Sequence, residues 1–373
     1  MTEPFDDGEF EVVRRRGLRT GFTTGACATA ASLAATRMLL SGMPVESVSI
    51  HLPVGIDASF ELASAKAEDG RVRCVVIKDA GDDPDVTHGA EIAATVWWGV
   101  QRGVELLGGV GVGVVTRPGL GLELNRPAIN PVPRRMILEA VRSEAGSVLG
   151  ERGLVVEISV PKGEELARRT LNGRLGILGG LSILGTTGIV KPYSTASYRA
   201  SVGQGIDVAA ANGQSEVVLS TGGRSERFAQ TALGLPEVAY VEMGEFTGHA
   251  LKRCVHRRIQ RVHLSGMIGK LSKVAQGHFM THVAGNQVDP PFLAGLAAEC
   301  GASAELQTLM TAANTARHAQ ELAQAAGLTG FFDQVARATA ESCARYVEGT
   351  LAVDCLLFDF DGTLLGRGGV EAR

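Results

Sequence analysis

The chain has 373 residues, of which 48 are glycine, about 13% against an average near 7%. Hydrophobic residues make up 45% and prolines number only 13, which excludes a disordered chain, and the glycines follow no period of three, which excludes collagen. The net charge of −4 excludes a global basic field that would recruit nucleic acid. The length predicts two domains.

The cysteines show no pattern of a metal site. None lies in a Cys-x-x-Cys pair or in a Cys/His cluster with zinc spacing, so we expect buried thiols in a reducing compartment and no protein metal. They are Cys27, Cys74, Cys254, Cys300, Cys343 and Cys355.

The N-terminal residues 1–16 are acidic and then basic, without the apolar run of a signal peptide. The longest uncharged stretch, Leu175–Val190, has about 16 residues and is shorter than a membrane span. We therefore expect a cytoplasmic protein without a membrane partner.

After a flexible tail at 1–13, residues 14–200 predict an α+β domain. Ala- and Leu-rich or proline-preceded segments predict helices at 24–40 and 134–149. Alternating or β-branched residues predict strands at 45–52, 58–67, 72–78, 90–98, 110–116 and 154–160. Asp69-Gly70 predicts a hairpin turn, and Gly173–Thr195 is a glycine-rich connector.

Residues 201–373 predict a Rossmann-like α/β domain with a mostly parallel sheet, because a strand, a glycine turn and a helix recur three times. Strands are predicted at 216–220, 238–242, 261–265 and 353–358. Residues 291–348 predict Ala-rich helices, which could pack internally or form the interface of a homo-oligomer.

The segment Ser220–Glu226, STGGRSE, ends a predicted strand and begins a helix. Two glycines permit a tight turn, and the free N–H groups at a helix start suit a nucleotide or a carboxylate. Glu242 ends the next strand, where an acidic side chain would accept hydrogen bonds from ribose hydroxyls. An ordinary turn of a parallel sheet is the alternative. The candidate cofactor-binding residues are Thr221, Gly222, Gly223, Ser225, Glu226, Glu242 and Gly244.

Two other segments match a phosphate-binding or a phosphatase motif only in part. Gly266–Lys273, GMIGKLSK, has two residues between its glycines where a phosphate-binding loop needs four, so it favours an anion-binding helix start over an ATPase. Asp359–Gly366, DFDGTLLG, matches the nucleophile segment of haloacid-dehalogenase phosphatases, but only residues 367–373 follow it. We interpret it as a terminal strand with an Asp-Gly turn.

His278 and His282 lie four residues apart in HFMTHV and would share one face of a helix. Neither a glutamate between them nor a third ligand is evident, so contact with a substrate carboxylate is favoured over a metal site, with simple packing as the alternative.

Two Thr-Thr-Gly turns, Thr20–Ala26 and Leu184–Val190, are flanked by basic residues. Arginine, lysine and hydroxyl groups are the natural partners of carboxylates. We therefore hypothesise that the residues of these two turns, their basic neighbours and His282 form a substrate-binding face. Its candidate members are Arg19, Thr23, Thr24, Thr186, Thr187, Lys191 and His282.

Taken in order along residues 15–365, five segments resemble the cobalt-precorrin-5B C(1)-methyltransferase family. They are LRTGFTTGACATAAS, GGLSILGTTGIVKPYS, STGGRSE, EMGEFTGHAL and GMIGKLSKVAQGHFMTH. One departure follows His282, where Val283-Ala284 replaces the family's usual serine and basic residue.

The resemblance implies a two-domain methyltransferase of anaerobic cobalamin biosynthesis that uses S-adenosyl-L-methionine. It would methylate C-1 of cobalt-precorrin-5B, a tetrapyrrole, to give cobalt-precorrin-6A, and the cobalt would belong to the substrate. No catalytic residue or general base is identified. An ATP-using small-molecule kinase and a non-catalytic tetrapyrrole carrier stay open as alternatives, and neither nucleic acid nor membrane is an expected partner.

Overall fold

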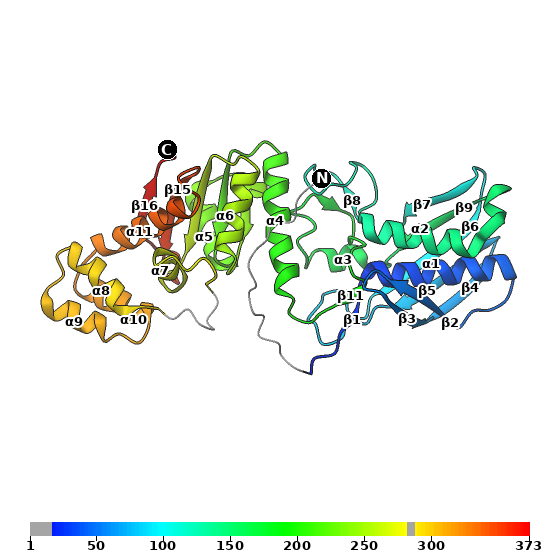
Figure 1. Ribbon diagram of the computed structural model, residues 1–373, viewed down its shortest axis with the longest axis horizontal. Helices are drawn as coiled ribbons and strands as arrows, with labels where there is room; N and C mark the ends of the chain where they lie inside the picture. The colour runs from blue at the N-terminus through cyan, green and yellow to red at the C-terminus, as the bar shows by residue number, and fades with distance from the viewer. Residues whose placement is uncertain (1–16, 282–287) are drawn as a thin grey trace. The chain divides into compact units, whose positions relative to one another are not determined.

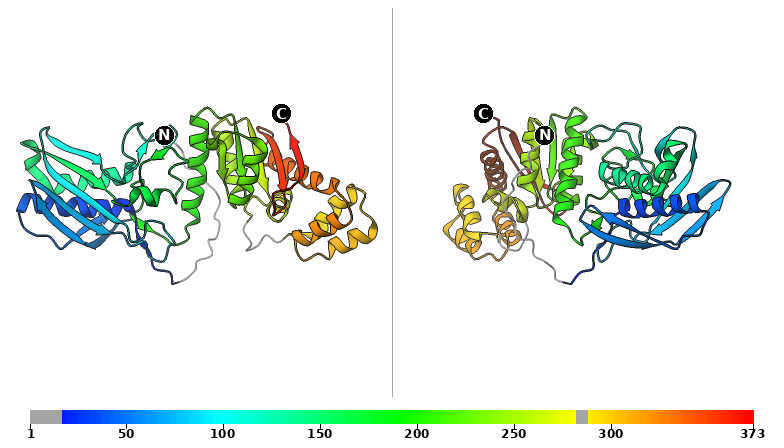
Figure 2. Two further views of the ribbon diagram at one scale, coloured as in Figure 1. Left: turned by 180° about the vertical axis from the view of Figure 1, so that it is seen from behind. Right: turned by 45° about the vertical axis from the view of Figure 1, so that its right-hand side comes forward.

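The computed structural model describes residues 17–281 and 288–373, and divides into two compact units (Figures 1 and 2). Unit 1 comprises residues 1–117 and 121–195, and unit 2 comprises residues 118–120 and 196–373. Both contain β-strands and helices, so the chain is a mixed α/β protein.

Unit 1 is built on a five-stranded sheet in the order β4-β5-β6-β9-β7. Its strands are β4 (Ser64–Glu68), β5 (Arg71–Ile77), β6 (Glu91–Gly99), β7 (Gly103–Gly108) and β9 (Gly153–Ser159). Only the β7–β9 pair is parallel. The inward residues of β5, β6 and β9 pack against two helices, α1 (Thr24–Ser41) and α2 (Pro131–Ala145), and this forms the core of the unit.

Helix α1 is confirmed where the sequence predicts it. Its residues 24–36 are all buried, and most of them are Ala, Gly, Ser or Thr, whose small side chains allow close approach of the sheet and of α2. The Thr23 hydroxyl accepts a hydrogen bond from the Ala26 N–H at the helix start. Gly42 ends the helix in the left-handed conformation, with φ of 68°.

The predicted strand at 58–67 is wrong, because the structure divides it between two sheets. Its first part is β3 (Ile56–Glu61), which pairs with β2 (Ser47–Leu52), and its second part is β4. Two backbone hydrogen bonds fix the point at which the chain passes from the first sheet to the second. The Leu62 N–H donates to the Glu46 carbonyl, and the Ala63 N–H donates to the Val75 carbonyl. The turn at Asp69-Gly70 is confirmed, with φ of 50° and 73°.

The predicted strand at 110–116 shortens to β8 (Val114–Val115), and β7 is an additional strand. A side chain at Gly111 or Gly113 would meet the backbone of Val160 or Gly180 at 1.9 or 2.8 Å, so the segment before β8 packs closely against neighbouring backbone, and only β8 pairs as a strand, with β10. The glycine-rich connector also returns to unit 1, in short pairs with β8 and β1. The remaining short elements are β1 (Gly21–Phe22), β10 (Ile177–Leu178), β11 (Ile189–Val190), η1 (Gly146–Gly150) and α3 (Gly163–Ala167).

Unit 2 contains a second five-stranded sheet in the order β13-β12-β14-β15-β16. The first four strands are parallel, and β16 is antiparallel to β15. They are β12 (Glu216–Ser220), β13 (Tyr240–Glu242), β14 (Arg261–Gly266), β15 (Ala352–Phe358) and β16 (Leu364–Val370). The short helix η2 (Glu237–Ala239) takes the first half of the predicted strand at 238–242.

Helices cover both faces of this sheet (Figure 1). Helix α5 (Gly223–Leu233) packs through Ala229 against Val218 and Leu356 on one face. The other face packs against α4 (Thr195–Ala211), α6 (Thr247–His256), α7 (Ile268–Ala275) and α11 (Gly330–Tyr346).

The Ala-rich stretch is helical as predicted, in α8 (Pro290–Glu299), α9 (Ala304–Thr311), α10 (Ala316–Ala325) and α11. The first three of these helices lie beside one another at one end of unit 2 (orange in Figure 2). The DFDG segment is a hairpin turn between β15 and β16, as predicted, and the Asp359 carboxylate pairs with Arg317. Within the described residues, no helix is both long and apolar enough to cross a membrane.

Candidate functional site

The two Thr-Thr-Gly turns lie together on unit 1. Strand β1 pairs with β11, so that Phe22 lies opposite Ile189. Two hydrogen bonds extend the contact: the Thr23 N–H donates to the Gly188 carbonyl and the Gly25 N–H to the Leu184 carbonyl, both at 3.0 Å. We name residues 19–24 and 186–191 the Thr-Thr-Gly surface.

The two Thr-Thr pairs of this surface have different environments. Thr23 and Thr24 are buried and engaged within the protein. The Thr24 hydroxyl accepts from the Leu184 N–H at 2.9 Å and donates to the Leu184 carbonyl at 3.2 Å, which locks the two turns together. Thr186 and Thr187 are exposed, as is Lys191. The first pair therefore shapes the surface, and the second pair is exposed, with the Thr187 hydroxyl exchanging hydrogen bonds with the Ile189 carbonyl and N–H.

Arg19 is exposed and is held by an acidic loop that follows β5. Its guanidinium makes a bidentate pair with the Asp79 carboxylate, with Nη2 to Oδ1 at 3.0 Å. The Arg19 backbone N–H donates to the Asp82 carboxylate at 2.6 Å. The hydrogen bond from Arg19 is the main cause that lowers the pKa of Asp79 to about 2. A ligand carboxylate that reaches Arg19 must therefore compete with Asp79.

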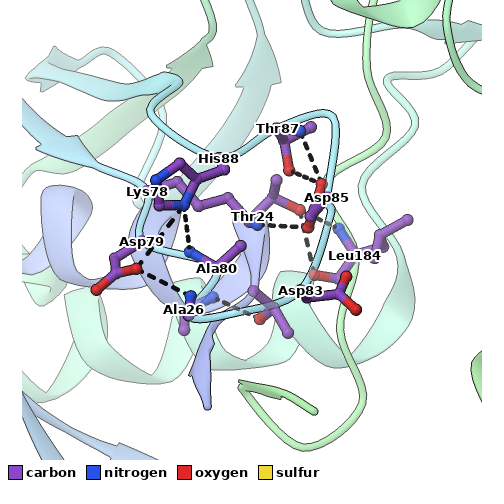
Figure 3. Close-up of polar contacts among 12 residues, drawn as sticks. Thr24, Ala26, Lys78, Asp79, Ala80, Asp83, Asp85, Thr87, His88 and Leu184 are labelled. Carbon is purple, nitrogen blue, oxygen red and sulfur yellow. Dashed lines mark hydrogen bonds and ion pairs between the residues drawn. The ribbon is translucent and has the colours of Figure 1, made fainter. Parts of the chain in front are cut away.

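An ion pair between a buried lysine and a partly buried aspartate anchors this loop (Figure 3). Lys78 is 1% exposed, and its ammonium donates to the Asp85 carboxylate at 2.6 Å. Asp85 also accepts from the N–H and hydroxyl of Thr87. Burial would raise the pKa of Asp85, but the hydrogen bonds from Lys78 and Thr87 outweigh it and hold that pKa below its usual value. Lys78, Asp85 and Asp79 are not among the residues predicted from the sequence, although the run DAGDDPD after a predicted strand that ends in lysine is a usable signal.

In unit 2, the loop after β12 and the first turn of α5 together carry most of the candidate cofactor residues. Gly222 has an extended backbone, with φ of 168°, and a Cβ placed there would have no neighbour within 4 Å. Two hydrogen bonds, both of 2.8 Å, fix this turn. The Ser265 hydroxyl donates to the Ser225 carbonyl, and the Ser225 hydroxyl donates to the Gly222 carbonyl. The backbone at Gly222 thus faces open space on a rigid support.

The carboxylate of Glu242 lies beside this turn. Its Oε2 is 3.4 Å from the position that a Cβ on Gly223 would take. The N–H of Met243 donates to the Ser220 carbonyl, which ties the end of β13 to the end of β12. Gly244 follows in the left-handed conformation, where a side chain would collide with the Tyr198 ring at 2.9–3.2 Å. The structure therefore brings Glu242 and Gly244 to the glycine turn.

Glu226 lies within this loop region but is turned inward. It is 6% exposed, and its carboxylate accepts from the Ser220 hydroxyl at 3.4 Å. Thr221 is also 6% exposed, and its carbonyl accepts a hydrogen bond from the Lys270 ammonium at 2.5 Å. Lys270 was not among the candidate residues, although the GMIGK segment that contains it was singled out for anions.

His282 lies outside the described residues, so the structure does not place it. Within residues 17–281 and 288–373, no cluster of three or more His, Cys, Asp or Glu side chains could hold a metal ion. Burial raises the pKa of the Cys27 and Cys355 thiols to about 12, which makes both poor nucleophiles.

Sheets of parallel strands with glycine-rich turns at their carboxyl ends are typical of α/β proteins that bind nucleotide-like ligands. The family described as "CbiD" matches residues 11–192, and "CbiD, C-terminal domain" matches residues 280–369. The chain belongs to the cobalt-precorrin-5B C(1)-methyltransferase family, to which these two descriptions and the relatives below point.

Curated relatives of this chain carry the name cobalt-precorrin-5B C(1)-methyltransferase. That of Salinispora arenicola is 52% identical over 94% of this chain and 92% of its own length. Those of Geobacillus sp. strain WCH70 and Rubrobacter xylanophilus are 49% and 50% identical, over 95% and 94% of this chain and 97% and 90% of their own lengths. A crystal structure of a cobalamin biosynthesis protein (cbiD) from Archaeoglobus fulgidus is 26% identical, with a TM-score of 0.38 over 83% of this chain and 85% of that one.

Proposed function

We propose that this protein transfers the methyl group of S-adenosyl-L-methionine to C-1 of cobalt-precorrin-5B, giving cobalt-precorrin-6A in the anaerobic route to cobalamin. The observation that carries the proposal is the 52% identity over 94% of the chain to a relative of that name. The cobalt enters with the tetrapyrrole substrate. The proposed setting is the cytoplasm, without nucleic acid or membrane as a partner.

The donor is assigned to unit 2, which we propose to be a Rossmann-like domain. Four parallel strands and the open turn at Gly222 support this assignment, because a ligand backbone can approach the turn closely. Glu242 would accept hydrogen bonds from the ribose hydroxyls. Ser225 acts through its support of the turn, Thr221 through its backbone hydrogen bonds with Ser265 and Lys270, and Gly223 would supply a backbone N–H.

The substrate is assigned to the Thr-Thr-Gly surface of unit 1. A corrin precursor carries acetate and propionate groups, which Arg19, Lys191 and the exposed hydroxyls of Thr186 and Thr187 would bind. Methyl transfer from a sulfonium to an electron-rich ring carbon is an in-line displacement, so the protein's contribution is orientation and exclusion of water. No covalent intermediate on a protein side chain is needed.

Arg19→Ala is expected to raise the KM for the tetrapyrrole about tenfold or more and to change kcat less. The substitution removes a guanidinium that would bind a substrate carboxylate, and this contact acts in substrate binding. Steady-state kinetics with varied tetrapyrrole measures both parameters. Arg71→Ala is a matched control, since this arginine stacks on Trp97 elsewhere in unit 1. Unchanged kinetics in Arg19→Ala would remove it from the site.

The function itself is tested by incubating the protein with cobalt-precorrin-5B and methyl-labelled S-adenosyl-L-methionine. Gain of one labelled methyl at C-1, located by mass and NMR analysis, is the expected result. Tight tetrapyrrole binding without methyl transfer would favour the carrier alternative. Mg²⁺-dependent ATP binding without S-adenosyl-L-methionine binding would favour the kinase, although the short loop at Gly266–Lys270 argues against it.

A further inference from the structure

The chain reverses its direction of travel across the sheet of unit 2 between β12 and β14. From β12 it passes through α5 on one face to β13, and from β14 it passes through α7 on the opposite face toward β15. Neighbouring strands whose connections leave in opposite directions open a crevice at their carboxyl ends, and ligands of α/β sheets bind there. The residues at the ends of β12 and β14 are therefore those that a ligand in this crevice would contact.

Lys270 joins the carboxyl ends of β12 and β14. It lies in the first turn of α7, directly after β14, and its ammonium donates to the carbonyl of Thr221, directly after β12, at 2.5 Å. A lysine ammonium has three N–H donors, and this contact uses one. Within the part of the chain that the structure describes, no carboxylate lies within 4.0 Å of this ammonium. A half-buried cation thus has donors to spare beside the glycine turn.

The electrostatic setting agrees with a missing anionic partner. Burial lowers the pKa of Lys270, and the charges of Glu242 and Glu245 offset this only in part, while Lys273 lowers it further. A ligand carboxylate in contact with the ammonium would compensate the burial of its charge. Lys273 on the same helix does not serve this role, since it is buried and its ammonium donates to the Thr281 carbonyl at 3.3 Å.

We infer that Lys270 binds the α-carboxylate of the methyl donor's amino-acid end, an inference that rests on the proposed function. Glu242 ends β13, and Gly222 and Lys270 follow the neighbouring strands β12 and β14. The ends of these three adjacent strands together span about 10 Å. A ligand with ribose hydroxyls at one end and a carboxylate at the other matches this order of an acidic group, an open backbone turn and a cation. Lys270 accordingly distinguishes adenosyl ligands that carry the amino-acid end from those that lack it.

Calorimetry with two product-like ligands tests this role. S-adenosylhomocysteine carries the carboxylate, and 5′-methylthioadenosine lacks the amino-acid end. Lys270→Met is expected to lower the affinity for S-adenosylhomocysteine about 10- to 100-fold, the usual range for a lost charge-assisted hydrogen bond. The affinity for 5′-methylthioadenosine is expected to stay within about twofold of the wild-type value. Lys270→Arg, which keeps the charge, is expected to retain most of the affinity. Lys252→Met, on the exposed face of α6, is the control for loss of a positive charge.

Three outcomes overturn the inference. Equal weakening of both ligands in a folded Lys270→Met would show that Lys270 only holds the Thr221 loop in place. No weakening of either would place the carboxylate elsewhere. If the wild-type protein binds neither ligand and the methyl-transfer assay is also negative, the proposed function fails together with the inference. If the methyl-transfer assay is positive but Lys270→Met binds S-adenosylhomocysteine with unchanged affinity, the inference alone is rejected.

Discussion

Gly222→Val is expected to weaken binding of S-adenosylhomocysteine about 100-fold, or roughly 3 kcal/mol, while the protein stays folded. The backbone at Gly222 is extended, with φ of 168°, so valine is compatible with its conformation. A Cβ there meets no protein atom within 4 Å, so the new side chain would occupy the space assigned to the ligand. Calorimetry measures the affinity, and thermal unfolding is expected to shift by no more than about 2 °C.

Gly295→Val is the matched control, because a Cβ at Gly295 in α8 also has no neighbour within 4 Å. It is expected to leave the affinity unchanged. If Gly222→Val binds the ligand as tightly as the wild type, the donor does not lie against this turn, and the assignment to the carboxyl end of β12 is falsified. A loss of affinity accompanied by unfolding would instead show that the turn needs glycine for the fold.

The sequence predicts well where its signal is local. The three strand–glycine–helix segments of unit 2 were predicted within a few residues, because short β-branched strands, glycine turns and helices each depend on neighbouring residues. The turn at Asp69-Gly70 is also predicted from a local signal, because its left-handed backbone conformation depends on these two adjacent residues. The error at 58–67 arose because nothing in that segment shows that its two halves bond to partners in different sheets.

Contacts distant in sequence were harder to predict. The sequence places the two Thr-Thr-Gly turns in one predicted substrate-binding face, but their contact depends on the pairing of Phe22 with Ile189, which no local pattern encodes. The bridge from Lys270 to Thr221 joins two loops that only the sheet order makes adjacent. Candidate residues on such loops could be identified by chemistry, while their partners required the fold.

Asp85→Ala is expected to lower the free energy of unfolding of unit 1 by about 3–5 kcal/mol, the largest stability effect that we predict. The ammonium of Lys78 is 1% exposed and would lose its carboxylate partner, and an unpaired buried charge is costly. Both tryptophans of the chain, Trp97 and Trp98, lie in β6 of unit 1, so their fluorescence during urea unfolding reports this unit. Asp57→Ala, whose side chain is 80% exposed beside His51, is the control and should change stability by less than about 0.5 kcal/mol.

The double variant Lys78→Met/Asp85→Asn separates loss of the ion pair from loss of packing. It removes both charges and keeps an oxygen that accepts from Thr87, so it is expected to recover most of the stability that Asp85→Ala loses. The pKa of Asp85 is lowered in the folded protein, so its stabilising contribution is present above the unfolded pKa and is lost as the pH falls through the folded pKa. The double variant should therefore lose less stability than the wild type on acidification. If Asp85→Ala and the double variant are equally unstable at neutral pH, the unpaired buried charge of Lys78 is not the source of the cost.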